Sequence, residues 1–101
     1  MIVQIVRFKS GLTKEQVMQK YNSRAPRYRE MNGLIQKYYL KYPETGEYGA
    51  VYLWESESAL KEFQQSELGQ TIASSYKIQG DPEVRMAEVV MTLHDIESVK
   101  T

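Results

Sequence analysis

The best candidate for a reactive site is a set of four residues with a 4-3-4 spacing. They are Val17, Tyr21, Arg24 and Tyr28. If residues 14–31 form a helix, this spacing puts all four on one face, and the apolar Val17 indicates that the face points inward. Arg24 would then lie among tyrosines, where a guanidinium can bind a carboxylate or stabilise an enolate or phenolate. The structural alternative is that Arg24 extends to the surface or pairs with a glutamate.

Two aromatic residues, Tyr52 and Trp54, alternate along an expected strand and therefore share one of its faces. Rings with polar tips suit a pocket for an aromatic ligand. The same rings also suit an interface between two sheets of a dimer, and this is the interpretation that we favour. Tyr38 is a candidate neighbour across the hairpin.

His94 is the only histidine, and it follows the last apolar run of the chain. An imidazole titrates near neutral pH, so His94 is a candidate general base at the end of the last strand. The sequence places no acid that would orient its ring. The alternative is an exposed or interface histidine without a chemical role.

Other kinds of site have no pattern in the sequence. One histidine and scattered carboxylates give no metal-ligand spacing, and the absence of cysteine removes thiolate sites and disulfides. There is no catalytic triad, phosphate loop or dinucleotide fingerprint. We therefore predict neither a metal nor a cofactor.

Size and charge narrow the class of protein. The chain of 101 residues has 13 basic and 13 acidic side chains, a balance that argues against nucleic-acid binding. Its apolar runs are far shorter than the ~20 residues that span a membrane, and its start does not resemble a signal peptide. We expect a single cytoplasmic domain over residues 1–101 with no membrane contact.

The elements that must position these residues follow from periodicity and capping signals. Thr13 and Gln16 form a capping box that begins the first helix, and Asn32-Gly33 ends it near residue 31. Ser56 caps a second helix. The expected strands are residues 2–8, 34–42, 48–54 and, after a break at 80–82, 84–93. The order β-α-β-β-α-β predicts a ferredoxin-like α+β fold with a four-stranded antiparallel sheet.

Alternation divides the strand residues into two faces. We expect the aliphatic set to lie beneath the helices: Val3, Ile5, Val51, Leu53, Val89, Met91 and Leu93. The mixed set would form the open face: Gln4, Val6, Phe8, Tyr52, Trp54, Glu88, Val90, Thr92 and His94. An open face of about 400 Å² is as large as the apolar patches that monomers expose. This predicts a homodimer that packs sheet on sheet; the alternative is that the rings lie on a solvated sheet.

The sequence also resembles a known superfamily, the dimeric α+β barrels. Residues 48–60, which read Tyr-Gly-Ala-Val-Tyr-Leu-Trp-Glu-Ser-Glu-Ser-Ala-Leu, are similar to the strand-to-helix signature of the antibiotic-biosynthesis-type and YdhR-type monooxygenases. Residues 11–16, 24–26 and 33–34 resemble the first-helix pattern of the ether-degradation (EthD-type) proteins. Taken with the order of the expected strands and helices, the resemblance extends over most of the chain.

The resemblance implies a dimer with a pocket between sheet and helices in each subunit. Such monooxygenases oxidise aromatic polyketides without metal or flavin, so the resemblance implies no cofactor. Two histidines of these families are replaced here: one matches Phe63, and the His-Ala-Pro of the EthD-type pattern reads Arg24-Ala25-Pro26. Each replacement removes a group that titrates near neutral pH.

These observations lead to one functional hypothesis and two alternatives. The hypothesis is a cofactor-independent monooxygenase-like enzyme that acts on a small aromatic or enolisable substrate. Arg24 would stabilise the substrate anion, and the pocket would be shaped by Tyr21, Tyr28, Tyr52 and Trp54. The alternatives are a non-enzymatic module that binds a small aromatic ligand, and a structural dimer without a ligand.

Overall fold

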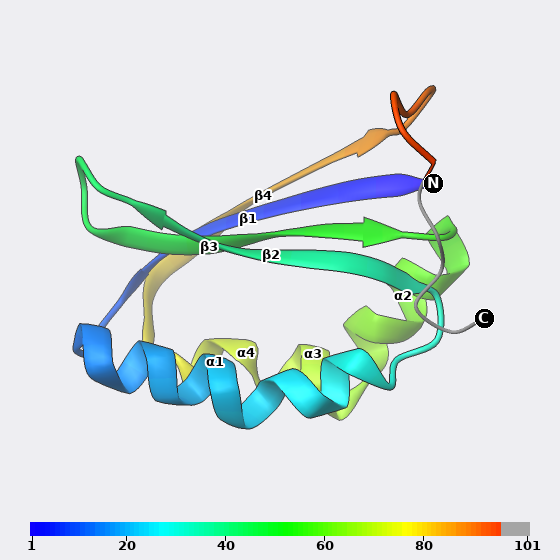
Figure 1. Ribbon diagram of the computed structural model, residues 1–101. Helices are drawn as coiled ribbons and strands as arrows, with labels where there is room; N and C mark the ends of the chain where they lie inside the picture. The colour runs from blue at the N-terminus through cyan, green and yellow to red at the C-terminus, as the bar shows by residue number, and fades with distance from the viewer. Residues whose placement is uncertain (96–101) are drawn as a thin grey trace.

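The computed structural model describes residues 1–95, which form one four-stranded sheet with helices on one of its faces (Figure 1). The elements run in the order β1 (Ile2–Ser10), α1 (Lys14–Arg29), β2 (Leu34–Tyr42), β3 (Glu47–Trp54), α2 (Glu57–Gln65), α3 (Glu67–Gln70), α4 (Ile72–Ser75) and β4 (Ile78–Glu88). The strand order in the sheet is β2-β3-β1-β4, and all neighbouring strands are antiparallel. The predicted ferredoxin-like α+β fold is confirmed.

The beginning of α1 has the predicted capping box. The Thr13 hydroxyl accepts a hydrogen bond from the Gln16 backbone N–H at 3.2 Å, and the Gln16 side chain accepts one from the Thr13 N–H at 2.9 Å. After α1, Gly33 adopts a positive φ of 83°. A Cβ at Gly33 would collide with the Cβ of Ala59, so the glycine allows the chain to pass close to α2 as it enters β2.

The last strand differs from the prediction at both ends. We expected a break at residues 80–82 and a strand over 84–93, but β4 runs through the break, from Ile78 to Glu88. Gly80 has a φ of 71°, and the pairing with β1 shifts register nearby, which indicates a bulge that absorbs the irregular residues. Pro82 is tolerated because β4 is an edge strand.

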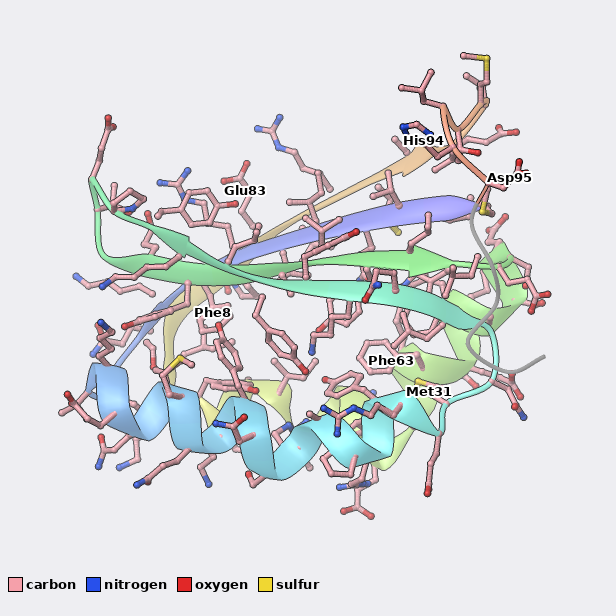
Figure 2. All side chains as sticks on the ribbon, viewed as in Figure 1. Phe8, Met31, Phe63, Glu83, His94 and Asp95 are labelled. Carbon is pink, nitrogen blue, oxygen red and sulfur yellow. The ribbon has the colours of Figure 1, made fainter. Side chains whose placement is uncertain are left out.

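The two faces of the sheet are exchanged relative to the prediction. The aromatic set lies beneath the helices: Gln4, Phe8, Tyr52 and Trp54 are all buried. Figure 2 shows Phe8 and Phe63 between the sheet and the helices. Since α1 and α2 themselves present Tyr21, Tyr28 and Phe63 to the sheet, large planar rings fill this layer. Alternation separates the residues of β1 and β3 into two sets correctly, but it does not say which set faces the helices. The members of both sets after Glu88 lie beyond the last strand.

The core between the layers consists of two neighbouring clusters. The first is centred on Trp54, whose side chain is fully buried and donates a hydrogen bond to the Gln4 side-chain oxygen at 3.0 Å. The second is centred on Val17, also fully buried, and contains Phe8, Tyr48 and Tyr76. Aromatic pairs in such clusters each add roughly 0.5–1.5 kcal/mol beyond simple burial.

The open face of the sheet carries the aliphatic residues of β1 and β3, whereas Val89, Met91 and Leu93 follow the end of β4 at Glu88. The register places Ile5 opposite Val51 and Val3 opposite Leu53. No helix of the described chain covers them, and the Ile5 residue is 38% exposed (Figure 1). Figure 2 shows Glu83 on this side, away from the helices. The sheet therefore does have an uncovered apolar face, but it is formed by aliphatic residues and not by Phe8 and Trp54.

Candidate functional site

All four residues of the 4-3-4 set are buried on the inner face of α1, as predicted. The Arg24 guanidinium reaches the short helices α3 and α4. Its Nη2 donates to the Leu68 carbonyl oxygen at 2.7 Å, and its Nη1 donates to the hydroxyls of Ser75 at 2.7 Å and Thr71 at 3.2 Å. Neither structural alternative holds among residues 1–95: Arg24 is only 8% exposed, and its guanidinium bonds to Leu68, Thr71 and Ser75 rather than to a glutamate.

The charge of Arg24 has no carboxylate partner among residues 1–95. Its three acceptors are neutral oxygens, and its Nε is buried without a hydrogen-bond partner. Burying a charge that only neutral groups solvate costs free energy of desolvation. The uncompensated positive charge also attracts negative charge to the surrounding interior. This layer of the protein is therefore electropositive.

Lys37 is a second cation of this layer, and it was missed in the sequence analysis. It lies in β2 opposite Tyr52 of β3, so its side chain points toward α1. Its Nζ lies 3.4 Å from the ring centroid of Tyr28, 4.5 Å from that of Tyr39 and 4.6 Å from that of Tyr52. The position of Lys37 in the alternation along β2 could have placed it on the helix-covered face. This requires the register of the hairpin, which pairs Lys37 with Tyr52.

The environment of Lys37 favours the neutral amine. Burial, and secondarily the positive charge of Arg24, lower the pKa of Lys37 to about 7. The unprotonated amine is therefore far more accessible near neutral pH than in an ordinary lysine. An unprotonated lysine can take a proton from a bound molecule or attack an electrophile.

A pocket of about 210 Å³ opens between α1 and β2. Tyr28, Lys37 and Tyr39 form part of its wall, and Arg29 lies at its exposed rim. The remaining lining residues are Ala25, Leu34, Ile35 and Gln36. Pockets for drug-sized molecules measure roughly 300–1,000 Å³, so this one suits a ligand of one or two rings.

The tyrosines around the pocket supply hydroxyl groups rather than phenolates. Burial raises the pKa of Tyr21, Tyr39, Tyr52 and Tyr76 above the ordinary value, so these rings stay neutral at physiological pH. The hydroxyls of Tyr21 and Tyr28 are both buried within this layer. A side-chain hydrogen bond with Tyr28 contributes to the raised pKa of Tyr52, so these hydroxyls belong to the core between sheet and helices and are not exposed to the pocket.

Tyr52 and Trp54 lie in the core of their own chain. They are 3% and 0% exposed, respectively, so the favoured interpretation as residues of a sheet–sheet interface is wrong. Their rings stack with centroids 5.8 Å apart. Tyr52 contacts the Lys37 amine. Trp54 stacks on the Tyr52 ring and does not line the pocket between α1 and β2.

His94 lies apart from this pocket. The strand that was expected to end beside it stops at Glu88, so His94 belongs to an exposed segment that has left the sheet. Figure 2 shows His94 and Asp95 on the side of the sheet away from the helices. A chemical role for His94 stays a prediction, and it is not a role in the pocket between α1 and β2.

The same residues indicate which molecules the pocket suits. Lysine, arginine and tyrosine side chains favour an anionic or phenolic organic molecule over a metal cation. Residues 1–95 contain no group of three or more His, Cys, Asp or Glu side chains that could hold a metal ion. None of the described helices is long and apolar enough to cross a membrane.

Comparisons with known proteins agree with this architecture. Residues 2–97 match the family model described as "Putative mono-oxygenase ydhR". Among solved structures, a putative antibiotic biosynthesis monooxygenase from Deinococcus radiodurans superposes with a TM-score of 0.74 at 10% identity, over 96% of this chain and 100% of that one. SnoaB from Streptomyces nogalater, a cofactor-independent oxygenase, gives 0.74 at 12% identity, over 93% and 97%.

A third structure extends the likeness. A putative antibiotic biosynthesis monooxygenase from Caulobacter crescentus has a TM-score of 0.75 at 17% identity, over 89% of this chain and 90% of that one. At these identities the structural likeness shows the fold alone. No curated protein matches the chain.

Proposed function

Since the chain belongs to the family described as putative mono-oxygenase ydhR, we propose that it oxidises a small aromatic or enolisable molecule with O2 in the pocket between α1 and β2, without a cofactor. The observation that carries this proposal is the position of Lys37, which lines the pocket with its amine against tyrosine rings, in surroundings that lower its pKa to about 7. Reaction of an organic molecule with O2 requires a carbanion, enolate or phenolate, and a neutral amine can generate one.

The proposed reaction begins with proton transfer. The Lys37 amine takes a proton from a phenol or from a carbon next to a carbonyl group. The ammonium that results lies beside the new anion. The positive charges of Arg24 and of Arg29 at the rim stabilise this anion further. For a methylene group the overall change is CH2 + O2 giving C=O + H2O. Substrate and oxygen supply all the electrons, so no reductant is needed.

The predicted site residues take different roles in this proposal. Tyr28 forms part of the wall, and its ring lies against the Lys37 amine. Tyr52 holds the Lys37 amine, and Trp54 and Tyr21 keep the surrounding rings in place. Arg24 is a positioning residue, because its guanidinium joins α1 to α3 and α4 and acts on the pocket through its charge.

We also propose that a second copy of the chain covers the open face of the sheet. The centre of that face is apolar, with Val3 and Ile5 opposite Leu53 and Val51. Ion pairs flank it, Arg7 with Glu47 at 2.8 Å and Arg85 with Glu83 at 2.7 Å. An isologous two-fold contact would bury the apolar centre and leave the charged pairs toward the rim.

The alternative function is a binding module without chemistry. It is favoured by one observation: the guanidinium of Arg24 is engaged by α3 and α4, and Arg24 is not among the residues that line the pocket. A site without a direct cationic contact to the reacting atoms would bind an aromatic ligand and leave it unchanged.

Oxygen uptake distinguishes the two functions. The probe is 2-tetralone, a two-ring ketone with a CH2 group between its ring and its carbonyl. We expect uptake above the uncatalysed rate with the wild type, loss of that uptake in Lys37→Met, and unchanged uptake in Lys41→Met. Lys41 is a matched control because it lies on the same strand, with its Nζ 6.0 Å from the Tyr48 ring centroid. Binding without uptake would refute the oxygenase and support the binding module.

A further inference from the structure

We infer that the Lys37 amine also captures carbonyl compounds, by forming an imine with a small aromatic aldehyde or ketone in the pocket between α1 and β2. This inference goes beyond the proposed function, since imine formation needs no oxygen and no acidic proton on the ligand. It concerns the same pocket but a different reaction, so each can fail without the other.

The position of the amine is the first argument. Nζ is held by the faces of Tyr28, Tyr39 and Tyr52 at 3.4–4.6 Å, and it makes no hydrogen bond or ion pair within residues 1–95. Its hydrogens are therefore not donated to a protein acceptor, and its lone pair accepts from no protein donor within residues 1–95. Because Lys37 forms part of the pocket wall, a ligand that enters the pocket meets this side chain directly.

The protonation state is the second argument. Only the unprotonated amine attacks a carbonyl carbon, and an ordinary lysine is unprotonated in fewer than about one molecule in a thousand at pH 7. Burial and the nearby Arg24 lower the pKa of Lys37 to about 7, which favours the reactive amine relative to an ordinary lysine. The guanidinium of Arg24 cannot itself compete, because arginine does not deprotonate in proteins.

The shape of the pocket is the third argument. A volume of about 210 Å³ with tyrosine rings in its wall accommodates one aromatic ring beside the amine. The planar faces of Tyr28 and Tyr39 provide stacking surfaces for that ring. The chemical class of ligand is therefore an aromatic aldehyde or ketone of one or two rings.

The covalent step balances without a further reactant. The Lys37 nitrogen bonds to the carbonyl carbon, and one proton moves from nitrogen to the carbonyl oxygen to give a carbinolamine. The carbon–oxygen bond then breaks, the hydroxyl leaves as water with the second nitrogen proton, and a C=N bond forms.

Reductive trapping tests the inference. Benzaldehyde is the probe, because it has no enolisable proton and cannot enter the proposed oxygenation. Sodium cyanoborohydride reduces any imine to a stable secondary amine, which peptide mass spectrometry assigns to a particular lysine. At pH 7 we expect Lys37 to be labelled at least about tenfold more than Lys41, the matched lysine of the same strand.

Two controls keep the result interpretable. The N-terminal amine of the expressed chain must also be labelled, which reports that the reagents work. Lys37→Arg retains a cation beneath the rings but has no nucleophilic amine, and it should lose only the label at position 37. Labelling of the N-terminus with equal, low labelling of Lys37 and Lys41 would overturn the inference.

The oxygen-uptake experiment remains separate from this one. Trapping of benzaldehyde at Lys37 without uptake of oxygen on 2-tetralone would refute the oxygenation alone. Uptake of oxygen without trapping would refute the imine alone.

Discussion

Replacing Lys37 by methionine should make the protein more stable at neutral pH and should abolish a rise of its stability with pH. The pKa of Lys37 is about 7 in the folded protein and near 10.5 in the unfolded chain. Between these two values the unfolded chain binds more protons than the folded one, so the free energy of unfolding of the wild type increases with pH. Below pH 7 both states are protonated, and this contribution levels off at its lowest value.

The magnitude follows from the two pKa values. The full difference corresponds to roughly 5 kcal/mol, because each pKa unit is about 1.4 kcal/mol. Between pH 7 and pH 9 the wild type should gain about 2 kcal/mol from this group. The tyrosine faces around Nζ favour the ammonium form and reduce the gain, so about 1–2 kcal/mol is the expected range. Methionine keeps an apolar chain beneath the rings and carries no charge to desolvate.

Urea denaturation at pH 6, 7, 9 and 10 measures this effect. Fluorescence of Trp54, the only tryptophan and fully buried, reports unfolding. Lys37→Met should be about 1–4 kcal/mol more stable than the wild type at pH 7 and nearly equal to it at pH 10. Lys41→Met is the control and should follow the wild type. Parallel curves for the wild type and Lys37→Met at every pH would refute the argument, because Lys37 would then not lose its charge near pH 7.

Further changes test other parts of the structure. Tyr21→Phe removes a buried hydroxyl without a partner in the described chain and should leave the melting temperature unchanged or raise stability by up to about 1 kcal/mol; a clear loss would mean that the hydroxyl is satisfied. Arg24→Gln removes hydrogen bonds to α3 and α4 and should lower the free energy of unfolding, measured in urea, by about 2–4 kcal/mol. The control Arg27→Gln, at an exposed position, should lower it by less than about 0.5 kcal/mol. Equal effects would contradict the role of Arg24 in joining α1 to α3 and α4. Ile5→Lys puts a charge on the open face of the sheet. In analytical ultracentrifugation this variant should sediment as a monomer and the wild type as a dimer. A wild type that is monomeric at micromolar concentration would refute the proposed second copy.

Local signals in the sequence predicted the element order and the inner face of α1. The capping box at Thr13 and the spacing from Val17 to Tyr28 depend only on neighbours within a few residues, and the structure has both. The last strand was placed wrongly because Gly80 and Pro82 are ordinary loop signals. An edge strand with a bulge can contain both residues, and edge position is a property of the whole sheet.

The candidate site was predicted only in part. Arg24 was correctly placed inside the protein, but its acceptors on α3 and α4 come from residues more than 40 positions away, which no spacing rule connects. Lys37 was missed because a lysine in an alternating strand is usually solvent-exposed. Its burial depends on the pairing of Lys37 with Tyr52 and on the tyrosines of α1. The exchange of the two sheet faces has the same origin, since ring size and not hydropathy decided which set fills the space beneath the helices.

The most direct test is an NMR titration of the Lys37 side chain. Protein labelled with 13C and 15N in lysine gives a separate Cε resonance for each lysine, and Lys37→Arg identifies the one in the pocket. The pocket chemistry described above predicts a midpoint near pH 7 for Lys37. A midpoint near 10.5, the ordinary value for lysine, would contradict it, because the amine would then be an ammonium at physiological pH and neither base nor nucleophile.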